Sequence, residues 1–369
     1  MDLELGTLPI ITLVNIRKQY ISMSNLTLED IAKLAGVSRS TASRVVNQQP
    51  NVREEVRQRV EQVILQTGYR PNVAARTLVS QRSWMIGLVL PRGVSSFFSD
   101  PYFPRLTQGI AQACNQHDYT LSLFLVSTPE DEEKIFTRVS RRGMLDGILV
   151  QSGQIGDRLI DRLTRAKIPL VIAGRPGGDY EVSYIDVDNI RAAEQAVSHL
   201  FHLGYRRVAL ITGAQNSPVS IDRRLGYEQA HRKRDQQVDD SLIAQGDFSE
   251  ASGYYAMQRI LPRQPDAVFS ASDQMAVGAM RAIQEAGLNI PNDIAIIGFD
   301  DLPFAQNTQP PLTTVRQPIY QFGFTAVELL IDLINNGIRP ARRILMNTDL
   351  IIRQSCGAFA NSSKKSLHS

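Results

Sequence analysis

Residues 26–47 read LTLEDIAKLAGVSRSTASRVVN, and this stretch decides the first part of the fold. Thr27 precedes Asp30 by three positions, a spacing that lets the two side chains satisfy free amide groups at a helix start. Gly36 can adopt the left-handed conformation that ends a helix, and Ser38 is a suitable N-cap for a second helix. A helix, a glycine-containing turn and a second helix form the motif that enters the DNA major groove. The stretch therefore predicts a helix-turn-helix.

The apolar residues that follow predict a third helix and a small core. They recur at helical spacing after residue 51, so one stripe can pack onto the first two helices. Asn51 together with Glu54 is expected to cap this third helix. The positions expected to face the core are Ala42, Val45, Val46, Val52, Val56, Val60, Val63 and Ile64. The three helices predict an all-α headpiece over residues 26–71.

A short segment, GYRPNVAARTL at residues 68–78, follows the third helix. Pro71 ends one element, and the small residues after it start another. Isolated helices of fewer than about 12 residues are marginal in water, so this segment should order only against a partner or DNA. Leu78 would then be an exposed apolar wedge of the kind that inserts between base steps in the minor groove. We predict a hinge segment over residues 72–82.

The charge of the chain is concentrated in the same region. Residues 26–82 contain nine basic and five acidic residues, a net charge of +4, whereas the whole chain of 369 residues carries +3. A plain helical hairpin with a solvated basic face is the structural alternative to a DNA-binding module. The agreement of motif, hinge and charge favours a phosphate-binding module attached to a neutral body.

Cysteine content, hydropathy and motifs exclude several classes of protein. Cys114 and Cys356 lie far apart, which argues against a disulfide framework or a metal cluster and is consistent with a reducing compartment. No apolar run approaches the roughly 18 residues that span a bilayer. The DVDN string at residues 186–189 lacks the other ligands of a calcium loop and is interpreted as a helix N-cap. The carboxylates Asp300 and Asp301 have no nucleophile motif, phosphate-binding loop or metal spacing beside them, so we expect neither an enzyme nor a cofactor.

Both ends of the chain are expected to lie outside the fold. Residues 1–22 contain the apolar run LPIITLV, but Arg17 and Lys18 follow this run instead of preceding it, unlike a secretory signal. We expect residues 1–22 to be disordered or to precede a natural start at Met23. The tail at residues 358–369 is also expected to be disordered. A chain of this kind is expected in the cytoplasm, associated with the nucleoid and not with a membrane.

From Trp84 onward, continuous apolar runs alternate with amphipathic helices, which predicts parallel sheets covered on both faces. The runs fall into two consecutive Rossmann-like α/β lobes over residues 84–357, which imply a cleft where the strand ends meet. We expect residues 84–186 and 312–337 in the first lobe, and residues 188–309 and 340–357 in the second. The expected strands are WMIGLVL, TLSLFLV, DGILVQ, IPLVIAG, RRVALITG, DAVFSA, DIAIIGFDD and, near the end, the single strand-like string ILMNTDLIIRQS. Residues 92–99 are expected to form a loop that reshapes the cleft entrance.

The strings LTLEDIAKLAGVSRSTASRVVN and GYRPNVAARTL resemble the headpiece and hinge of the lactose-repressor/galactose-repressor family of bacterial transcription regulators. The strings ASDQMAVGAMRAIQEAGLNIPNDIAIIGFDD and PPLTTVRQP resemble the type I periplasmic-binding-protein fold that this family carries behind its headpiece. The resemblance covers nearly the whole chain. It departs from the family pattern at Ala42, where valine is commoner, and at Arg53, where serine is usual. The family binds double-stranded operator DNA as a homodimer under the control of a small-molecule effector.

The resemblance assigns residues to both sites. At the DNA, Arg39, Ser40 and Arg44 would read base edges and Leu78 would intercalate. The full set implied for DNA binding is Thr27, Ser38, Arg39, Ser40, Thr41, Ser43, Arg44, Asn47, Tyr69, Asn72, Ala75 and Leu78. The set implied for effector binding is Tyr102, Phe103, Arg175, Arg223, Ser272 and Asp300. Alternatively, Asp300 caps a strand end, Arg223 is a surface charge, and Tyr102 and Phe103 belong to the core.

The chemistry of these residues leaves the effector open. Aromatic walls with an arginine and an aspartate suit a polyhydroxylated sugar, and the segment before Asp100 favours an oligosaccharide. The same groups suit a purine or nucleoside. Two further hypotheses share the two-lobed body: a sugar-binding receptor without regulatory DNA binding, and an α/β enzyme with an accessory DNA module. The sequence predicts a dimeric DNA-binding regulator, and the family resemblance implies that it acts as a repressor.

Overall fold

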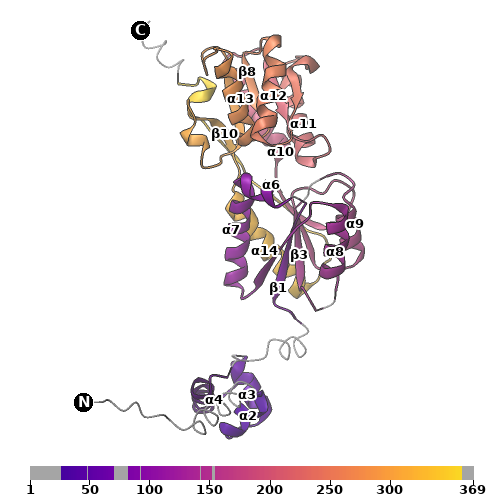
Figure 1. The fold of residues 1–369 in the computed structure, drawn as a ribbon, viewed down its shortest axis with the longest axis vertical. Helices are drawn as coiled ribbons and strands as arrows, with labels where there is room; N and C mark the ends of the chain where they lie inside the picture. The colour runs from indigo at the N-terminus through magenta and orange to yellow at the C-terminus, as the bar shows by residue number, and fades with distance from the viewer. Residues whose placement is uncertain are drawn as a thin grey trace, which may run out of the picture. The chain divides into compact units, whose positions relative to one another are not determined.

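The computed structural model describes residues 26–47, 49–69, 82–91, 93–141, 143–151 and 154–359. The chain divides into two compact units, one within residues 1–82 and the other from residue 83 onward. We call them the headpiece and the body, and each is described by itself (Figure 1). The predicted hinge residues 72–81, the extension at residues 1–22 and the tail from residue 360 lie outside the described residues.

The described part of the headpiece contains three helices: α2 (Leu28–Leu34), α3 (Arg39–Val46) and α4 (Glu54–Thr67). The predicted cap of α2 is confirmed, because the Thr27 hydroxyl accepts from the Asp30 N–H and the Asp30 carboxylate accepts from the Thr27 N–H at 2.9 Å. Gly36 has the left-handed φ of +63° that ends this helix. The Ser38 hydroxyl accepts from the Thr41 N–H at 3.1 Å and caps α3.

The core of the headpiece is smaller than the sequence indicates. Its buried members are Ile31, Ala35, Val45 and Val60, with Val52, Val63 and Ile64 packed against them. Ala42 is also buried, whereas Val46 and Val56 are only half-buried. The expected cap of α4 by Asn51 and Glu54 is wrong: Arg53 occupies the N-cap and no side chain accepts a hydrogen bond there. The start of α4 is exposed, so water can satisfy its free amides.

Two six-stranded sheets build the body, in the orders β11-β5-β4-β3-β1-β2 and β12-β10-β9-β8-β6-β7. The first lobe contains β1 (Met85–Leu90), α6 (Val94–Ser99), α7 (Tyr102–Gln116), β2 (Thr120–Leu125), α8 (Pro129–Val139), β3 (Gly147–Gln151), α9 (Arg158–Arg165), β4 (Leu170–Ala173), β5 (Ser183–Val187), α14 (Ile319–Asn336) and β11 (Arg343–Met346). The second lobe contains α10 (Asn189–His202), β6 (Val208–Thr212), α11 (Pro218–Arg232), β7 (Ile243–Gln245), α12 (Glu250–Ile260), β8 (Ala267–Ser270), α13 (Asp273–Glu285), β9 (Ala295–Asp300), β10 (Thr313–Arg316) and β12 (Asp349–Ile351).

Each sheet buries both faces, as its apolar strands predict. Successive side chains of a strand point to opposite faces. In β1, Leu88 and Leu90 pack in the cluster formed with α7 and α14, while Val89 packs in the cluster formed with α8 and α9. Figure 1 shows these helix pairs on opposite sides of the first sheet. Among the described strands, β10 and β12 pair antiparallel, and the other pairs within the two sheets are parallel.

The late segments are divided between the lobes differently from the expectation. β10 pairs with β9 in the second sheet, so residues 313–316 do not belong to the first lobe. β11 pairs with β5 in the first sheet, so residues 343–346 do not belong to the second. The string ILMNTDLIIRQS forms two strands, β11 and β12, in different sheets. The physical reason is that an apolar run carries no information about which open sheet edge it joins.

Three further elements differ from the expectation. Residues 94–99, expected as a loop, form the helix α6, in which Phe97 is buried against the core of the first lobe. Strands β5 and β7 were not predicted, because their sequences, SYIDV and IAQ, are too polar or too short to stand out. The N-cap interpretation of DVDN is confirmed, since the Asp188 carboxylate accepts from the Arg191 N–H at 3.0 Å at the start of α10. Among the described residues, no helix has both the length and the hydropathy to cross a membrane.

Candidate functional site

The headpiece presents one polar and basic face on α3. Ala42 and Val45 are buried on one side of the helix, so Arg39, Ser40 and Arg44 lie exposed on the other. The Ser38 hydroxyl lies 2.8 Å from the hydroxyls of both Ser40 and Thr41, which fixes the first turn. Arg39 and Arg44 lie about a turn and a half apart on this face. Basic side chains in this position can contact DNA phosphates and base edges.

The other predicted DNA-binding residues flank this face or lie beyond it. Thr27 is exposed at the start of α2, and its hydroxyl also donates to the Asp30 carboxylate at 2.7 Å. These bonds from Thr27 hold the pKa of Asp30 below its usual range. Asn47 ends α3, where its side-chain amide donates to the Ser43 carbonyl at 2.9 Å. Tyr69 is half-buried against the headpiece core, and burial raises its pKa. Asn72, Ala75 and Leu78 lie outside the described residues.

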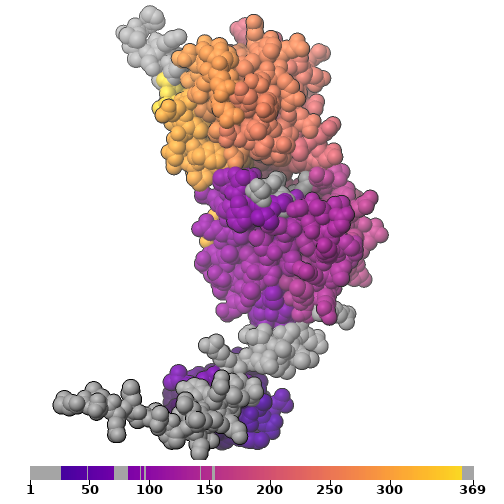
Figure 2. Space-filling view, in the orientation of Figure 1, coloured from indigo at the N-terminus to yellow at the C-terminus, as the bar shows by residue number. Residues whose placement is uncertain are grey.

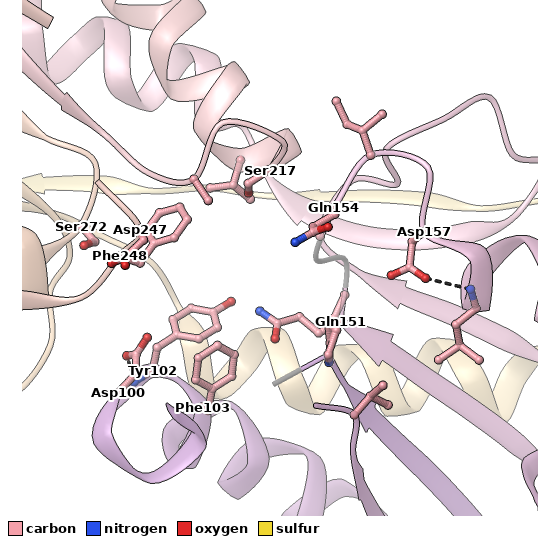
Figure 3. Close-up of a pocket in the computed structure, with 18 of the residues that line it drawn as sticks. Asp100, Tyr102, Phe103, Gln151, Gln154, Asp157, Ser217, Asp247, Phe248 and Ser272 are labelled. Carbon is pink, nitrogen blue, oxygen red and sulfur yellow. Dashed lines mark hydrogen bonds between the residues drawn. The ribbon is translucent and has the colours of Figure 1, made fainter. Parts of the chain in front are cut away.

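The body contains a cavity of about 560 Å³ lined by residues from both lobes. Its walls come mainly from the loops and helix starts that follow the carboxyl ends of parallel strands, where ligands of open α/β sheets bind. Figure 2 shows the two lobes of the body in contact, and Figure 3 shows the interior of the cavity. Five of the six predicted effector residues line it: Tyr102, Phe103, Arg223, Ser272 and Asp300.

Aromatic rings from both lobes form part of the wall. Tyr102 and Phe103 begin α7, with ring centroids 5.3 Å apart in an edge-to-face arrangement. Phe103 is only 1% exposed and belongs to the core as well as to the cavity wall. Burial raises the pKa of Tyr102 well above its usual range, so its hydroxyl stays protonated. Phe248 comes from the second lobe and points into the same space (Figure 3).

A buried arginine and a buried aspartate lie side by side in the wall. Arg223 of α11 donates from Nε to Asn189 Oδ1 at 3.0 Å and from Nη1 to the Ala271 carbonyl. Its guanidinium lies 3.5 Å above the centroid of the Phe299 ring. The Asp300 carboxylate is 3.9 Å from Arg223 Nη1. Arg223 is therefore neither a surface charge nor free to rotate.

Burial sets the protonation of this pair. Desolvation lowers the pKa of Arg223, although the charge of Asp300 acts in the opposite direction. Desolvation raises the pKa of Asp300 to about 7, even though Arg223 and a hydrogen bond from Gln317 at 2.6 Å lower it. Burial likewise raises the pKa of Asp186 to about 6. A ligand that donates hydrogen bonds to these carboxylates would stabilise their charged forms.

Two of the predicted effector residues, Ser272 and Arg175, have structural partners. Ser272 is the N-cap of α13, where its hydroxyl accepts from the Met275 N–H at 3.2 Å. Arg175 is not among the residues that line the cavity, so its assignment to the effector stays a prediction. Its guanidinium makes a bidentate contact with Asp222 of α11, at 2.9 and 2.8 Å. Since Arg175 follows β4 of the first lobe, this pair joins the two lobes.

Several cavity residues were missed by sequence reasoning. Gln151 is the last residue of β3, and its buried Oε1 atom has no hydrogen-bond partner among the residues that the structure describes. Asp100 and Asp247 come from loops before α7 and α12, and Gln154 comes from the loop after β3. Figure 3 shows Gln151, Gln154 and Tyr102 directed into the same space. The position of Gln151 at the carboxyl end of an apolar strand was the signal that could have identified it.

Comparisons with known proteins agree with both units. Residues 27–72 match the family described as bacterial regulatory proteins, lacI family, and residues 197–356 match the periplasmic binding protein-like domain. The HTH-type transcriptional regulator CelR of Thermobifida fusca is 35% identical over 333 residues, which cover 89% of this chain and 98% of the relative.

Two solved structures extend this similarity. The complex of the transcriptional regulator CelR with cellobiose has a TM-score of 0.72 and 33% identity, and the match covers 90% of this chain and 100% of that one. The Lac repressor dimer bound to operator and the anti-inducer ONPF has a TM-score of 0.77 and 27% identity, covering 90% and 99%. The helix-turn-helix headpiece, the two-lobed body and these relatives lead to one conclusion: this chain belongs to the LacI family of bacterial regulatory proteins.

Proposed function

We propose that this chain regulates transcription by binding a two-fold symmetric DNA operator as a homodimer, under the control of a sugar bound in the cavity of the body. The main support for DNA binding is the exposed face of α3. Arg39 and Arg44 flank Ser40 on this face, while the opposite face packs into the headpiece core. The net charge of +4 over residues 26–82 supplies attraction to the DNA backbone.

The small size of the headpiece supports a dimer. One headpiece of three short helices contacts few base pairs, so two copies reading a palindromic site are needed for specificity. The Lac repressor relative is a dimer bound to operator, which supports this assembly. The hinge residues Asn72, Ala75 and Leu78 are assigned to the minor groove on the same proposal, with Leu78 as the wedge.

The cavity supports a sugar as the effector. Aromatic rings of Tyr102, Phe103 and Phe248 offer apolar faces, while Arg223, Asp300 and Gln151 offer polar groups that can bond to hydroxyls. The CelR relative binds cellobiose in its solved complex, which supports a carbohydrate and specifically an oligosaccharide. A purine or nucleoside is the second candidate that the polar groups alone would admit.

The effector controls DNA binding through the arrangement of the lobes. A ligand held by residues of both lobes favours one arrangement of the body over another, and the two subunits then present their headpieces differently. Coupling of this kind is typically about 1–3 kcal/mol. We assign the cavity to binding without catalysis, because none of its described lining residues is a histidine or a cysteine and no nucleophile is paired with a base there. Operator binding places the protein with the chromosome in the cytoplasm.

Fluorescence anisotropy of the full-length protein with labelled fragments of its own upstream region tests this proposal. We expect one fragment to bind at least 1,000-fold more tightly than bulk competitor DNA, within the usual range for specific binding of about 10³–10⁷. Addition of the effector should shift that affinity by about 5- to 150-fold. Failure to discriminate any genomic fragment, with or without sugars and nucleosides, would exclude the proposed function.

A further inference from the structure

The wall of the cavity is rich in carboxylates. Its described lining residues include six acidic side chains and two basic ones: Asp100, Glu132, Asp157, Asp186, Asp247 and Asp300 against Arg158 and Arg223. Two like charges close together in a poorly solvated site repel each other more strongly than in water. A ligand with its own negative charge would therefore add to an existing excess.

The buried arginine does not offset this excess for an incoming anion. Arg223 already donates to Asn189 Oδ1 and to the Ala271 carbonyl, and its side chain is 5% exposed. Asp300 lies 3.9 Å away and supplies the counter-charge. A ligand phosphate or carboxylate at Arg223 would have to compete with Asp300 inside a site that already penalises negative charge. The raised pKa values of Asp186, to about 6, and of Asp300, to about 7, report that penalty.

Helix starts are the other common binding site for anions, but most of those in this wall are occupied by the chain itself. The Asp157 carboxylate accepts from the Leu159 N–H at 2.9 Å and caps α9. Asp100 accepts from the Tyr102 N–H at 3.0 Å at the start of α7. Thr128 caps α8 and Ser272 caps α13. These caps use the backbone donors that hold phosphate in other α/β proteins.

The start of α11 is the exception. Its N-cap, Ser217, lines the cavity and makes no side-chain hydrogen bond to the helix. Pro218 at the first helical position has no N–H to offer. The amides that remain there can donate to a neutral hydroxyl or ring oxygen as well as to an anion, so this helix start does not by itself require a charged ligand.

The wall needs hydrogen-bond donors. An ionised carboxylate can accept hydrogen bonds but cannot donate them, and the buried Gln151 Oε1 atom has no hydrogen-bond partner among the described residues. A sugar ring carries hydroxyl donors around its whole edge, whereas the N–H donors of a purine base all lie in the plane of the base. The polar groups are also spread along the cavity: Figure 3 places Ser272 and Asp157 at opposite sides, with Tyr102, Gln151 and Gln154 between them. A ligand of more than one ring would offer hydroxyls to both sides.

We propose that the effector is an uncharged oligosaccharide of two or more rings, and that the carboxylates of the wall reject sugars bearing phosphate or carboxylate groups. This inference rests on the proposed function, because it specifies the ligand class of the same cavity. The acceptors of the wall bind the hydroxyls, and Tyr102, Phe103 and Phe248 contact the ring faces. The charge selection distinguishes neutral oligosaccharides from sugar phosphates, uronates and nucleotides.

Isothermal titration calorimetry of the full-length protein tests the charge selection. The probes are cellobiose, cellotriose, maltose, lactose and sucrose, followed by the 6-phosphate and the terminal uronate of whichever disaccharide binds best, and by glucose, adenosine, guanine and hypoxanthine. We expect a neutral oligosaccharide to bind at least 100-fold more tightly than its anionic counterparts and than glucose. Comparable or tighter binding of an anionic sugar overturns the inference, as does tight binding of a purine or the absence of binding by every neutral oligosaccharide.

A variant separates charge from shape. Glu132→Gln removes one negative charge from the wall and keeps the side-chain size, and Glu132 has no capping role. The ratio of anionic to neutral affinity should rise several-fold in this variant, and should also rise with salt in the natural protein. Glu328→Gln, an exposed carboxylate of α14 outside the wall, is the control that should leave the ratio unchanged.

An unchanged ratio in Glu132→Gln and in high salt would refute electrostatic rejection. Operator binding is measured in parallel by anisotropy. If the operator complex forms and responds to an anionic sugar or a purine, the inference fails while the proposed function stands. If no operator complex forms at all, the proposed function fails, whatever the calorimetry shows.

Discussion

Asp300 has a backbone conformation that is rare for a non-glycine residue, and its carboxylate is buried. It has a φ of +123°, which a non-glycine residue adopts only when its surroundings enforce it. The carboxylate is 6% exposed, accepts from Gln317 and lies beside Arg223. β9 is buried along its whole length, so the chain must turn sharply where it leaves the sheet. The strain at Asp300 thus places a carboxylate in the cavity wall.

The first prediction concerns the pH dependence of stability. Burial raises the pKa of Asp300 to about 7, whereas aspartate in an unfolded chain titrates near 3.9. The folded protein therefore binds an extra proton between about pH 4 and 7, and the contribution of Asp300 to the free energy of unfolding falls as pH rises through this range. The side chain that replaces Asp300 in Asp300→Asn cannot ionise. The free energy of unfolding of this variant, minus that of the natural protein, should therefore be larger at pH 8 than at pH 5.

Denaturant unfolding at the two pH values measures this difference. Asp186 and Asp273 also have raised pKa values, and Asp100 and Arg223 face the same site, but all four are present in both proteins. Asp349→Asn, which alters an exposed carboxylate of β12, is the control. The same offset between Asp300→Asn and the natural protein at both pH values would contradict the prediction.

The second prediction concerns Arg223 and its neighbour in sequence. Arg223→Lys keeps the positive charge but loses the planar fork that bonds to Asn189 and Ala271 and stacks on Phe299. Effector affinity, measured by calorimetry, should fall at least tenfold. Arg224→Lys is the matched control, because Arg224 is exposed and pairs with Glu228 and Asp240 away from the cavity. Equal losses in the two variants would remove Arg223 from the site.

At the scale of the element, α3 presents its function through its two faces. The buried face of Ala42 and Val45 fixes its rotation, and Ser38 fixes its first turn. The exposed face is then determined. Arg39→Ala or Arg44→Ala should lower operator affinity by about 1–3 kcal/mol and relax the sequence preference at one base pair. Anisotropy on operator variants measures this loss, and Arg59→Ala on the exposed side of α4 is the control. Uniform weakening on all sequences would make both arginines phosphate contacts only.

The hinge gives a separate prediction at the same scale. If Leu78 inserts between base steps, Leu78→Ala should lose operator affinity and reduce DNA bending, with less effect on random DNA. Anisotropy and a gel-based bending assay measure the two effects. Leu65→Ala, which removes an exposed leucine of α4, controls for the loss of apolar surface in the headpiece. Retention of full bending by Leu78→Ala would rule out the wedge.

At the scale of the whole molecule, contacts between the two lobes of the body hold them in one relative arrangement. Arg175 of the first lobe pairs with Asp222 of the second, the Ile155 N–H donates to the Asn216 carbonyl at 2.8 Å, and Gln274 donates to the Ser99 carbonyl at 3.1 Å. Asp222 precedes Arg223 on α11, so the same helix carries an inter-lobe contact and a cavity residue. Any ligand that moves α11 therefore acts on the arrangement of the lobes.

The last prediction follows from this pair. Arg175→Met removes the inter-lobe ion pair, and an effector that requires the paired arrangement should bind about two- to fivefold more weakly, a modest effect because Arg175 is partly solvated. Calorimetry with Arg175→Met, Asp222→Asn and the double variant measures the coupling. Arg165→Met is the control, since its partner Asp161 lies on the same helix within one lobe. Additive losses in the double variant would mean that the pair does not carry the effect.

The sequence by itself determined the local structure. Caps at Thr27, Ser38 and Asp188, the left-handed Gly36 and the strands of alternating or continuous apolar residues follow from nearest neighbours in the chain, so they could be predicted. The family's motifs extended this to the predicted DNA contacts of α3 and to five residues that line the cavity.

Only the tertiary structure decided which distant segments meet. β10 and β11 belong to sheets other than those expected for their segments. Arg175 pairs with Asp222. Gln151 and Asp247 line the cavity, although the sequence analysis did not identify them. The charge balance of the cavity became visible only when these residues were brought together. The physical reason is that hydrogen-bond capping and side-chain periodicity act over a few residues, whereas sheet pairing and desolvation depend on partners that lie far away in the chain.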